Sequence, residues 1–222
     1  MNGLDFLFCG RALRALPSGA LWWADQRMLC VSDLHLGKSE RLARRSGLTL
    51  PPYDGRETLD RLSADLDASG AETVLCLGDS FDDLDASNAL AASEKLQITR
   101  LQAGRKWIWI EGNHDPGPIE LGGTHLAEWV KGPLVFRHIA EANAKGEVSG
   151  HFHPKARLSI RGRSISRPAF LVDQNRLILP AYGTYTGGLR SSDHVLSDLM
   201  QSDAMAILTG PNPQMIPMPR TA

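Results

Sequence analysis

Cysteine is scarce in this sequence, with three residues among 222. Cys9, Cys30 and Cys76 lie in apolar, strand-like runs, and no two of them have the Cys-x-x-Cys spacing of a redox or zinc motif. An odd number of thiols without such spacing argues against a disulfide framework and against a thiolate zinc site. We therefore expect three reduced cysteines in the core.

Long hydrophobic runs are also absent, because no stretch approaches the roughly 18 apolar residues of a membrane-spanning helix. Near the N-terminus, Asp5, Arg11 and Arg14 interrupt the apolar residues before the core of a signal peptide is reached. The sequence also lacks an excess of charge of either sign. Its 24 Lys and Arg against 25 Asp and Glu give a net charge of −1, so any basic patch must be local. These features predict a cytoplasmic protein that contacts no membrane.

Three short apolar runs in the first half each end at Gly, Asp or Asn, as strands buried on both faces do. They are residues 27–33, 73–79 and 106–113. Leucines at helical spacing fill the first gap, which ends at Gly70, and a second helical segment at 87–104 ends at Gly104. The order strand, helix, strand, helix, strand predicts a parallel α/β beginning, and a hairpin over 20–33 that turns at 24–26 precedes it.

Beyond residue 130 the helical signal fades, and short strands separated by turn residues predict a mostly antiparallel half. These strands fall within residues 133–140, 147–153, 156–162, 168–174 and 176–183. With 42% hydrophobic residues the chain can build one sizeable core, so we expect a single domain over 1–210. The Pro-rich segment 211–222 is expected to form an extended tail.

Polar residues gather at the ends of these expected strands. In chain order they are Asp33, His35, Asp79, Asn113, His114, His138, His151 and His153. Each alone has an ordinary explanation as a helix cap, a turn residue or a hydrogen-bonded histidine. Together, imidazoles and carboxylates without thiolates are ligands for Mn, Fe(II) or Zn. His125 and His194 match no such pattern, and we interpret them as structural.

Five blocks occur in order between residues 33 and 153: D-x-H, G-D-x-x-D, G-N-H-D, a separate H, and G-H-x-H. In this ordered set the sequence resembles the calcineurin-like metallophosphoesterases. The resemblance implies an α/β fold with α+β character, a four-layer α/β/β/α sandwich of two mixed sheets. It also implies a site for two divalent metal ions, with manganese expected and iron or zinc as alternatives.

Position by position, the resemblance implies two ligand sets. One metal would be held by Asp33, His35, Asp79 and His153, and the second by Asp79, Asn113, His138 and His151. Asp79 would bridge them, which suits the ~3.5–4 Å separation of two-metal hydrolytic sites. Two divalent ions contribute four positive charges, and the carboxylates of Asp33 and Asp79 neutralise two of them. The remaining charge of about +2 would be enough to hold a bridging hydroxide and a phosphoryl oxygen.

Two further residues carry roles by resemblance. His114 would stabilise or protonate the leaving oxygen, and Asp82 would orient that histidine, although Asp82 also suits a simple helix cap.

The second block continues as "GDSFDD" and lacks the phosphate-binding Arg of the related protein phosphatases, which disfavours protein phosphatase activity. All ligand positions are present, which disfavours an inert scaffold.

A run of cations follows the first block. Arg41, Arg44 and Arg45 would share one face of a short helix, either as a solvated face or as a basic strip beside the metals. The blocks "DLHLGKSERLARRSG", "GHFHP" and "LILPAYGTYTGGL" resemble the bacterial ligase-associated phosphoesterases, called PdeM. That resemblance implies a Mn-dependent phosphodiesterase or endonuclease acting on single-stranded DNA in repair, alongside a DNA ligase, a helicase and an exonuclease.

The "TYTGGL" segment adds candidate substrate contacts. Gly187 and Gly188 would let the backbone approach the site, and Tyr182 or Tyr185 would stack on a base; the alternative is an ordinary turn with core aromatics.

Two other functions stay open: hydrolysis of small phosphodiesters or pyrophosphates such as cyclic nucleotides or nucleotide-sugars, and a non-catalytic scaffold in a repair complex.

Overall fold

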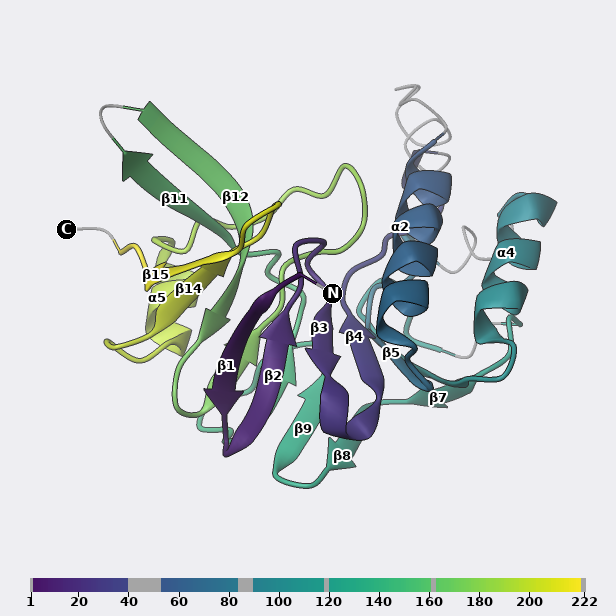
Figure 1. The fold of residues 1–222 in the computed structure, drawn as a ribbon, viewed down its shortest axis with the longest axis horizontal. Helices are drawn as coiled ribbons and strands as arrows, with labels where there is room; N and C mark the ends of the chain where they lie inside the picture. The colour runs from purple at the N-terminus through teal and green to yellow at the C-terminus, as the bar shows by residue number, and fades with distance from the viewer. Residues whose placement is uncertain (1, 40–52, 84–89, 118–119, 161–162, 221–222) are drawn as a thin grey trace.

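Two β-sheets packed face to face form the centre of the computed structural model, which describes residues 2–39, 53–83, 90–117, 120–160 and 163–220 (Figure 1). The first sheet contains, in spatial order, β1 (Leu4–Phe8), β2 (Arg11–Ala15), β3 (Leu21–Trp23), β4 (Met28–Val31), β5 (Thr73–Leu77), β6 (Lys106–Ile110) and β7 (Thr124–Leu126). The second contains, in spatial order, β15 (Gln214–Pro217), β14 (Met205–Leu208), β12 (Arg163–Val172), β13 (Arg176–Ile178), β10 (Glu147–Ser149), β9 (Leu134–Arg137) and β8 (Glu128–Lys131), while β11 (Lys155–Ile160) pairs with β12 alone.

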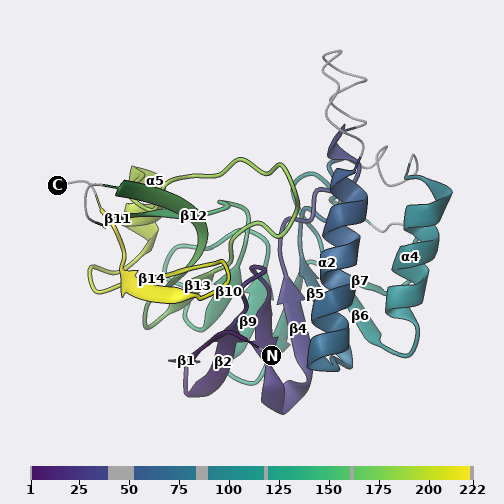
Figure 2. The ribbon, with the colours of Figure 1, turned by 45° about the horizontal axis from the view of Figure 1, so that its top comes forward.

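Helices cover the outer faces of the two sheets, which gives the predicted four-layer arrangement (Figures 1 and 2). Leucines of α2 (Asp54–Ser69) and α4 (Ala92–Gln102) pack on the first sheet, and α5 (His194–Leu199) packs on the second. A separate cluster, with Phe8, Phe136 and Phe170 among its fully buried members, fills the space between the sheets. Three apolar interfaces therefore hold four layers.

The predicted parallel unit is confirmed: β4, β5 and β6 pair in parallel, with α2 and α4 as the connections. Leu59, Leu62 and Leu66 of α2 are all buried against the sheet. Gly70 ends α2 with φ 61°, and its N–H donates to the Leu66 carbonyl at 2.9 Å, as expected for a glycine in the left-handed region. The hairpin formed by β3 and β4, joined by a 3-10 turn over Ala24–Gln26, is also confirmed.

The second half is mostly antiparallel, as predicted, except that β10 pairs in parallel with both β9 and β13. In the segment from residue 211, which was expected to form an extended tail, Gln214–Pro217 is extended and pairs with β14 as the edge strand β15. Pro217 has no N–H, and an edge strand tolerates it because one side of the strand needs no donor.

The three cysteines are unpaired, as expected. Cys30 and Cys76 are buried, whereas Cys9 follows β1 and is only half-buried, so its placement in a core strand was wrong. Within the described residues, no helix has both the length and the apolar character needed to cross a membrane.

Candidate metal centre

The ligand residues lie in loops that leave the strands at one edge of the two sheets. Asp33 and His35 follow β4, Asp79 follows β5, and His138 follows β9. Five of the seven predicted ligands have φ between 45° and 70°, the left-handed region that side-chain-bearing residues seldom occupy: Asp33, His35, Asp79, His151 and His153. Such concentrated backbone strain is typical of functional sites, because a scaffold must hold it in place.

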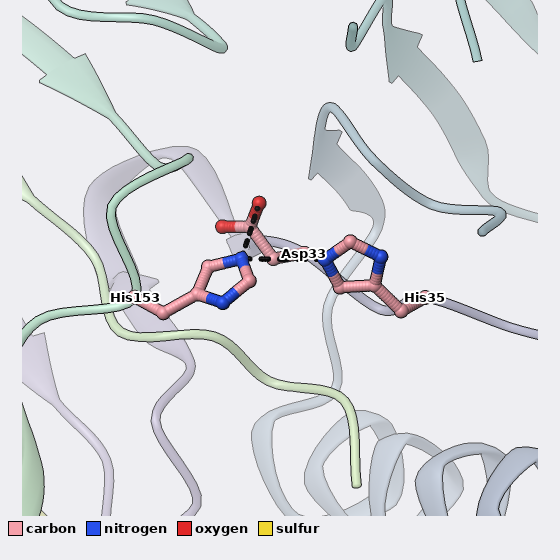
Figure 3. A group of neighbouring side chains, drawn as sticks. All are labelled: Asp33, His35 and His153. Carbon is pink, nitrogen blue, oxygen red and sulfur yellow. Dashed lines mark hydrogen bonds and ion pairs between the residues drawn. The ribbon is translucent and has the colours of Figure 1, made fainter. Parts of the chain in front are cut away.

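The first candidate metal group contains Asp33, His35 and His153, whose ligand atoms all lie within 4.8 Å of one another (Figure 3). The His153 Nε2 atom lies 3.2 Å from Asp33 Oδ1 and 3.3 Å from the Nε2 atom of His35. Asp33 is fully buried, and its other oxygen accepts a hydrogen bond from the Ser32 hydroxyl at 2.6 Å. Sequence reasoning missed this Ser32 contact.

The second candidate group contains Asp79, His138 and His151, again within 4.8 Å. The His138 Nε2 atom lies 3.2 Å from Asp79 Oδ2, 3.3 Å from His151 Nδ1 and 3.0 Å from Asn113 Oδ1. The structure therefore brings all four residues of the second predicted set together, and three of the four in the first. Asp79 belongs to the second group only, and its bridging role stays a prediction.

The two groups adjoin, since His138 Nδ1 lies 3.9 Å from Asp33 Oδ1. Hydrogen bonds outside the groups settle which histidine nitrogens are available. His138 Nδ1 donates to the Leu77 carbonyl at 3.0 Å, and His35 Nδ1 lies 3.0 Å from Asp82 Oδ1. Because a carbonyl and a carboxylate only accept, both Nδ1 atoms carry a proton, so in the neutral form of each ring the Nε2 atom presents a lone pair to its group.

This arrangement fits divalent metal ions. In each group two ring nitrogens face each other at 3.3 Å beside a buried carboxylate, a contact in which nitrogen lone pairs oppose one another unless one is protonated. A cation shared by the lone pairs and the carboxylate removes that conflict. The donors are nitrogen and oxygen atoms without thiolates, the set suited to Mn, Fe or Zn.

The carboxylates are held in their charged form. Burial raises the pKa of Asp79, but the hydrogen bond from His138 and the charges of His138 and His114 outweigh it and lower the pKa to about 2. Likewise, His153, His138 and Ser32 lower the pKa of Asp33 in spite of its burial. Burial and the neighbouring His138 lower the pKa of His151, which favours the neutral form that binds a metal.

Asp82 contacts two histidines of the site with different atoms, and its predicted role in orienting His114 stays a prediction. Its carboxylate contacts metal-group residue His35, as described above, whereas His114 Nδ1 donates to the backbone carbonyl of Asp82 at 2.9 Å. Asp82 thus contacts His114 through its main chain and His35 through its side chain. His114 is one-third exposed, its Nε2 atom lies 4.0 Å from Asp79 Oδ2, and it belongs to neither metal group, as the resemblance implied.

Asp115 is a site residue that sequence reasoning overlooked, although it is the last letter of the "GNHD" block. It is buried, and its Oδ1 atom accepts from the N–H groups of Asp79 and Gly112, both at 3.0 Å. Its Oδ2 atom accepts from Ser80 at 2.8 Å and Phe81 at 3.2 Å. One carboxylate therefore fixes the loops that carry Asp79 and Asn113. Burial raises the pKa of Asp115 to about 6.

Close packing between the loops explains the glycine of the second block. A Cβ atom on Gly78 would lie 2.3 Å from His138 Nδ1, an impossible contact. The His138 ring therefore lies directly against the backbone of the "GDSFDD" loop, and any side chain at residue 78 would displace it.

Of the predicted substrate-binding residues in the described part of the chain, some are accessible and one is buried. Tyr182 is 1% exposed and its hydroxyl donates to Asp65 at 2.8 Å, so no base can stack on it; its ring instead packs under Arg61, with 4.7 Å between the guanidinium carbon and the ring centroid. Tyr185 is 48% exposed and stays available. A Cβ atom on Gly188 would lie 2.0 Å from the His153 carbonyl oxygen, so this backbone does approach the site, while Gly187 has open space around it.

The remaining predicted residues lie elsewhere. Arg41, Arg44 and Arg45 fall outside the described residues. His125 stacks on Trp109 with 6.4 Å between ring centroids, and His194 begins α5, so neither joins a metal group.

Known proteins similar to this chain include phosphoesterases and a nuclease. The family model of calcineurin-like phosphoesterases matches residues 26–203. Among solved structures, a Pseudomonas putida nuclease, MPE, is 27% identical with a TM-score of 0.75, over 96% of this chain and 100% of that one. Yfce, a phosphoesterase from E. coli, is 13% identical with a TM-score of 0.44, over 86% of this chain and 99% of that one. A search of curated proteins found no match.

Proposed function

Because this chain belongs to the calcineurin-like phosphoesterase family and is a metal-dependent phosphoesterase, we propose that it hydrolyses phosphodiester bonds in nucleic acid, with single-stranded DNA as its substrate. The observation that carries the proposal is the likeness to a nuclease over nearly the whole of both chains, together with two adjoining metal groups in this one. A fold alone would not support a substrate, since one fold serves many activities.

Two divalent ions, when bound, supply Lewis-acid activation of the phosphate and an acidified water molecule. The chain's own residues do the rest. The residues of the Asp33 and Asp79 groups would hold these ions. His114 donates its Nδ1–H to the Asp82 carbonyl, so the doubly protonated ring can give its Nε2 proton to the leaving oxygen of the substrate and become neutral. Its partial exposure suits a group that meets substrate.

We propose manganese as the native metal, with iron or zinc as alternatives, because the donor set of imidazoles, carboxylates and one amide oxygen suits these ions. We also propose that the protein works in the cytoplasm beside a DNA ligase, a helicase and an exonuclease. This last proposal depends on the resemblance of "DLHLGKSERLARRSG" to the ligase-associated enzymes, and co-purification of these enzymes with the tagged protein tests it.

A digest by Mn-loaded protein tests the substrate. Single-stranded DNA, duplex DNA, RNA and an aryl phosphodiester are compared at equal phosphodiester concentration, with Asp33→Asn as the metal-site control. We expect cleavage of single-stranded DNA to be the most efficient and to be lost in the control. Turnover of the aryl diester without cleavage of any nucleic acid would instead support a hydrolase of small diesters, and inactivity on every substrate would support the scaffold.

A further inference from the structure

The hairpin of β11 and β12 carries an unusual concentration of positive charge. Residues 155–168 include five basic and no acidic side chains, in a chain whose net charge is −1: Lys155, Arg157, Arg161, Arg163 and Arg167. The hairpin begins two residues after the candidate metal ligand His153 and projects from the body of the molecule (Figure 1). Lys155 and Arg157, at the base of the hairpin, are therefore within four residues of a candidate metal ligand.

The strand register separates the hairpin into two faces. Directly paired residues share a face, so Arg157 and Ser166 lie on the same side as Lys155, while Ala156 and Arg167 lie on the other. Ala156 is buried and Leu158 packs on the cluster beneath α5, so that side faces the protein near the base of the hairpin. The Lys155 and Arg157 side is the outward one, where Arg157 and Ser166 are exposed.

A second segment extends this outward face. Arg190 forms a parallel bridge with Lys155, which places the two side chains on one side, and it is exposed. Arg157 donates a hydrogen bond from Nε to the Ser164 hydroxyl. Within the described part of the chain, none of Lys155, Arg157 and Arg190 forms an ion pair. We call these three residues the hairpin cation face.

The hairpin cation face is continuous with the metal centre. The Lys155 ammonium donates to the Thr186 carbonyl at 3.3 Å, and its backbone N–H donates to Leu189 at 2.8 Å. The same loop lies against His153 through Gly188 and exposes Tyr185. Figure 2 shows this loop, between β13 and α5, passing from the hairpin side of the molecule toward α2.

We propose that the hairpin cation face binds the phosphate backbone of the nucleic acid on one side of the bond that is cleaved. The proposal rests on the proposed nuclease function and adds a binding surface to it. Residues 155 and 157 lie roughly 7 Å apart along a strand, at about 3.3–3.4 Å per residue. Cations at that spacing, with Ser164 and Ser166 on the same face of the hairpin, match successive phosphates. A small diester has a single phosphate, so a molecule held by that phosphate at the metals has no second phosphate for Arg157.

The test uses charge-matched variants of the metal-loaded protein. Arg157→Gln, Arg190→Gln and their combination remove cations from the outward face, and Arg167→Gln removes one from the opposite face of the same hairpin. Lys155 is left intact because its ammonium holds the Thr186 loop. For each variant, kcat/KM is measured on a labelled single-stranded oligonucleotide across a salt series, and on an aryl phosphodiester.

Each lost phosphate contact should reduce the steepness of log kcat/KM against log salt by about 0.7, hence by about 1.4 in the double variant, since each contact releases condensed counterions. Turnover of the aryl diester and the salt slope of Arg167→Gln should match the unsubstituted protein. Three results would overturn the inference: equal slopes in the double variant and Arg167→Gln, a parallel loss on both substrates, or an unsubstituted protein that turns over only the aryl diester. The last result would refute the proposed function itself, whereas the first two leave it standing.

Discussion

Asp82→Ala is the substitution whose outcome depends most directly on the geometry of the metal centre. Asp82 is 1% exposed, and its Oδ1 atom accepts a hydrogen bond from the Nδ1–H group of His35 at 3.0 Å. Removing the carboxylate leaves that buried N–H without its acceptor and frees the His35 ring to change tautomer or orientation. The contact between His114 and residue 82 should survive, because it uses the backbone carbonyl.

The magnitude follows from two independent estimates. A hydrogen bond to a charged group contributes about 1.5–3 kcal/mol. Loss of a partner that orients a metal-binding histidine typically costs about 10–100-fold in metal affinity, which is about 1.4–2.7 kcal/mol. We therefore expect one of the two metals to bind about 10–100-fold more weakly in Asp82→Ala. Asp82→Asn keeps an oxygen acceptor of the same shape and should lose less.

Calorimetric titration of the metal-stripped protein with Mn²⁺ measures this effect, and a series of aryl phosphodiesters with leaving groups of different acidity separates it from an effect on His114. With saturating metal, the Asp82→Ala rate should depend on the leaving group as the unsubstituted protein does. Two results together would refute the reasoning: unchanged metal affinity at both sites, and a rate loss that grows for poor leaving groups. They would mean that the Asp82 carboxylate orients His114 instead of His35.

Four further predictions follow from the site. Asp79→Asn should lower metal content and turnover more than a change at any ligand serving one metal, measured by elemental analysis and initial rates; near-normal content would exclude a bridging role. His114→Ala should keep both metals yet lose about 10²–10⁴-fold in rate, less for acidic phenol leaving groups, and equal losses for all leaving groups would count against proton donation. Tyr182→Phe should reduce the free energy of unfolding in urea by roughly 1–3 kcal/mol through the lost hydrogen bond to α2, with an unchanged midpoint as the contrary result. Changing the three arginines within residues 41–45 to Gln should raise KM for single-stranded DNA and flatten its salt dependence without affecting an aryl diester; no change on either substrate would mean a solvated helix face.

The sequence was most informative where a local pattern carries its own geometry. Continuous apolar runs predicted the parallel strands β4, β5 and β6, because only strands covered on both faces lack polar positions. The strand-end rule then brought the polar residues to one edge, since parallel strands point their carboxyl ends the same way. The short strands β7 and β8 were missed because they are only partly buried and show no apolar run.

Other features of the site depend on information that local sequence does not contain. Residue 82 offers both a carbonyl and a carboxylate, and no pattern says which of them faces His114 and which faces His35. Tyr182 stands beside an exposed glycine-rich loop, but its ring is buried because Arg61 and Asp65, more than a hundred residues earlier, bind it from α2. The hairpin cation face needs the register of β11 and β12, which separates Arg157 from Arg167.

The left-handed backbone at five metal-group residues has a consequence for how this site is best dissected by mutagenesis. Alanine at these positions would remove a ligand and also place a residue that tolerates positive φ poorly, at a cost of about 1–2 kcal/mol, so a lost activity would mix misfolding with lost metal. Asparagine accepts this conformation far better than most residues. A scan that places Asn at Asp33, His35, Asp79, His151 and His153 in turn would keep the loop geometry nearly constant, so a change in metal content would reflect the changed ligand rather than a changed backbone.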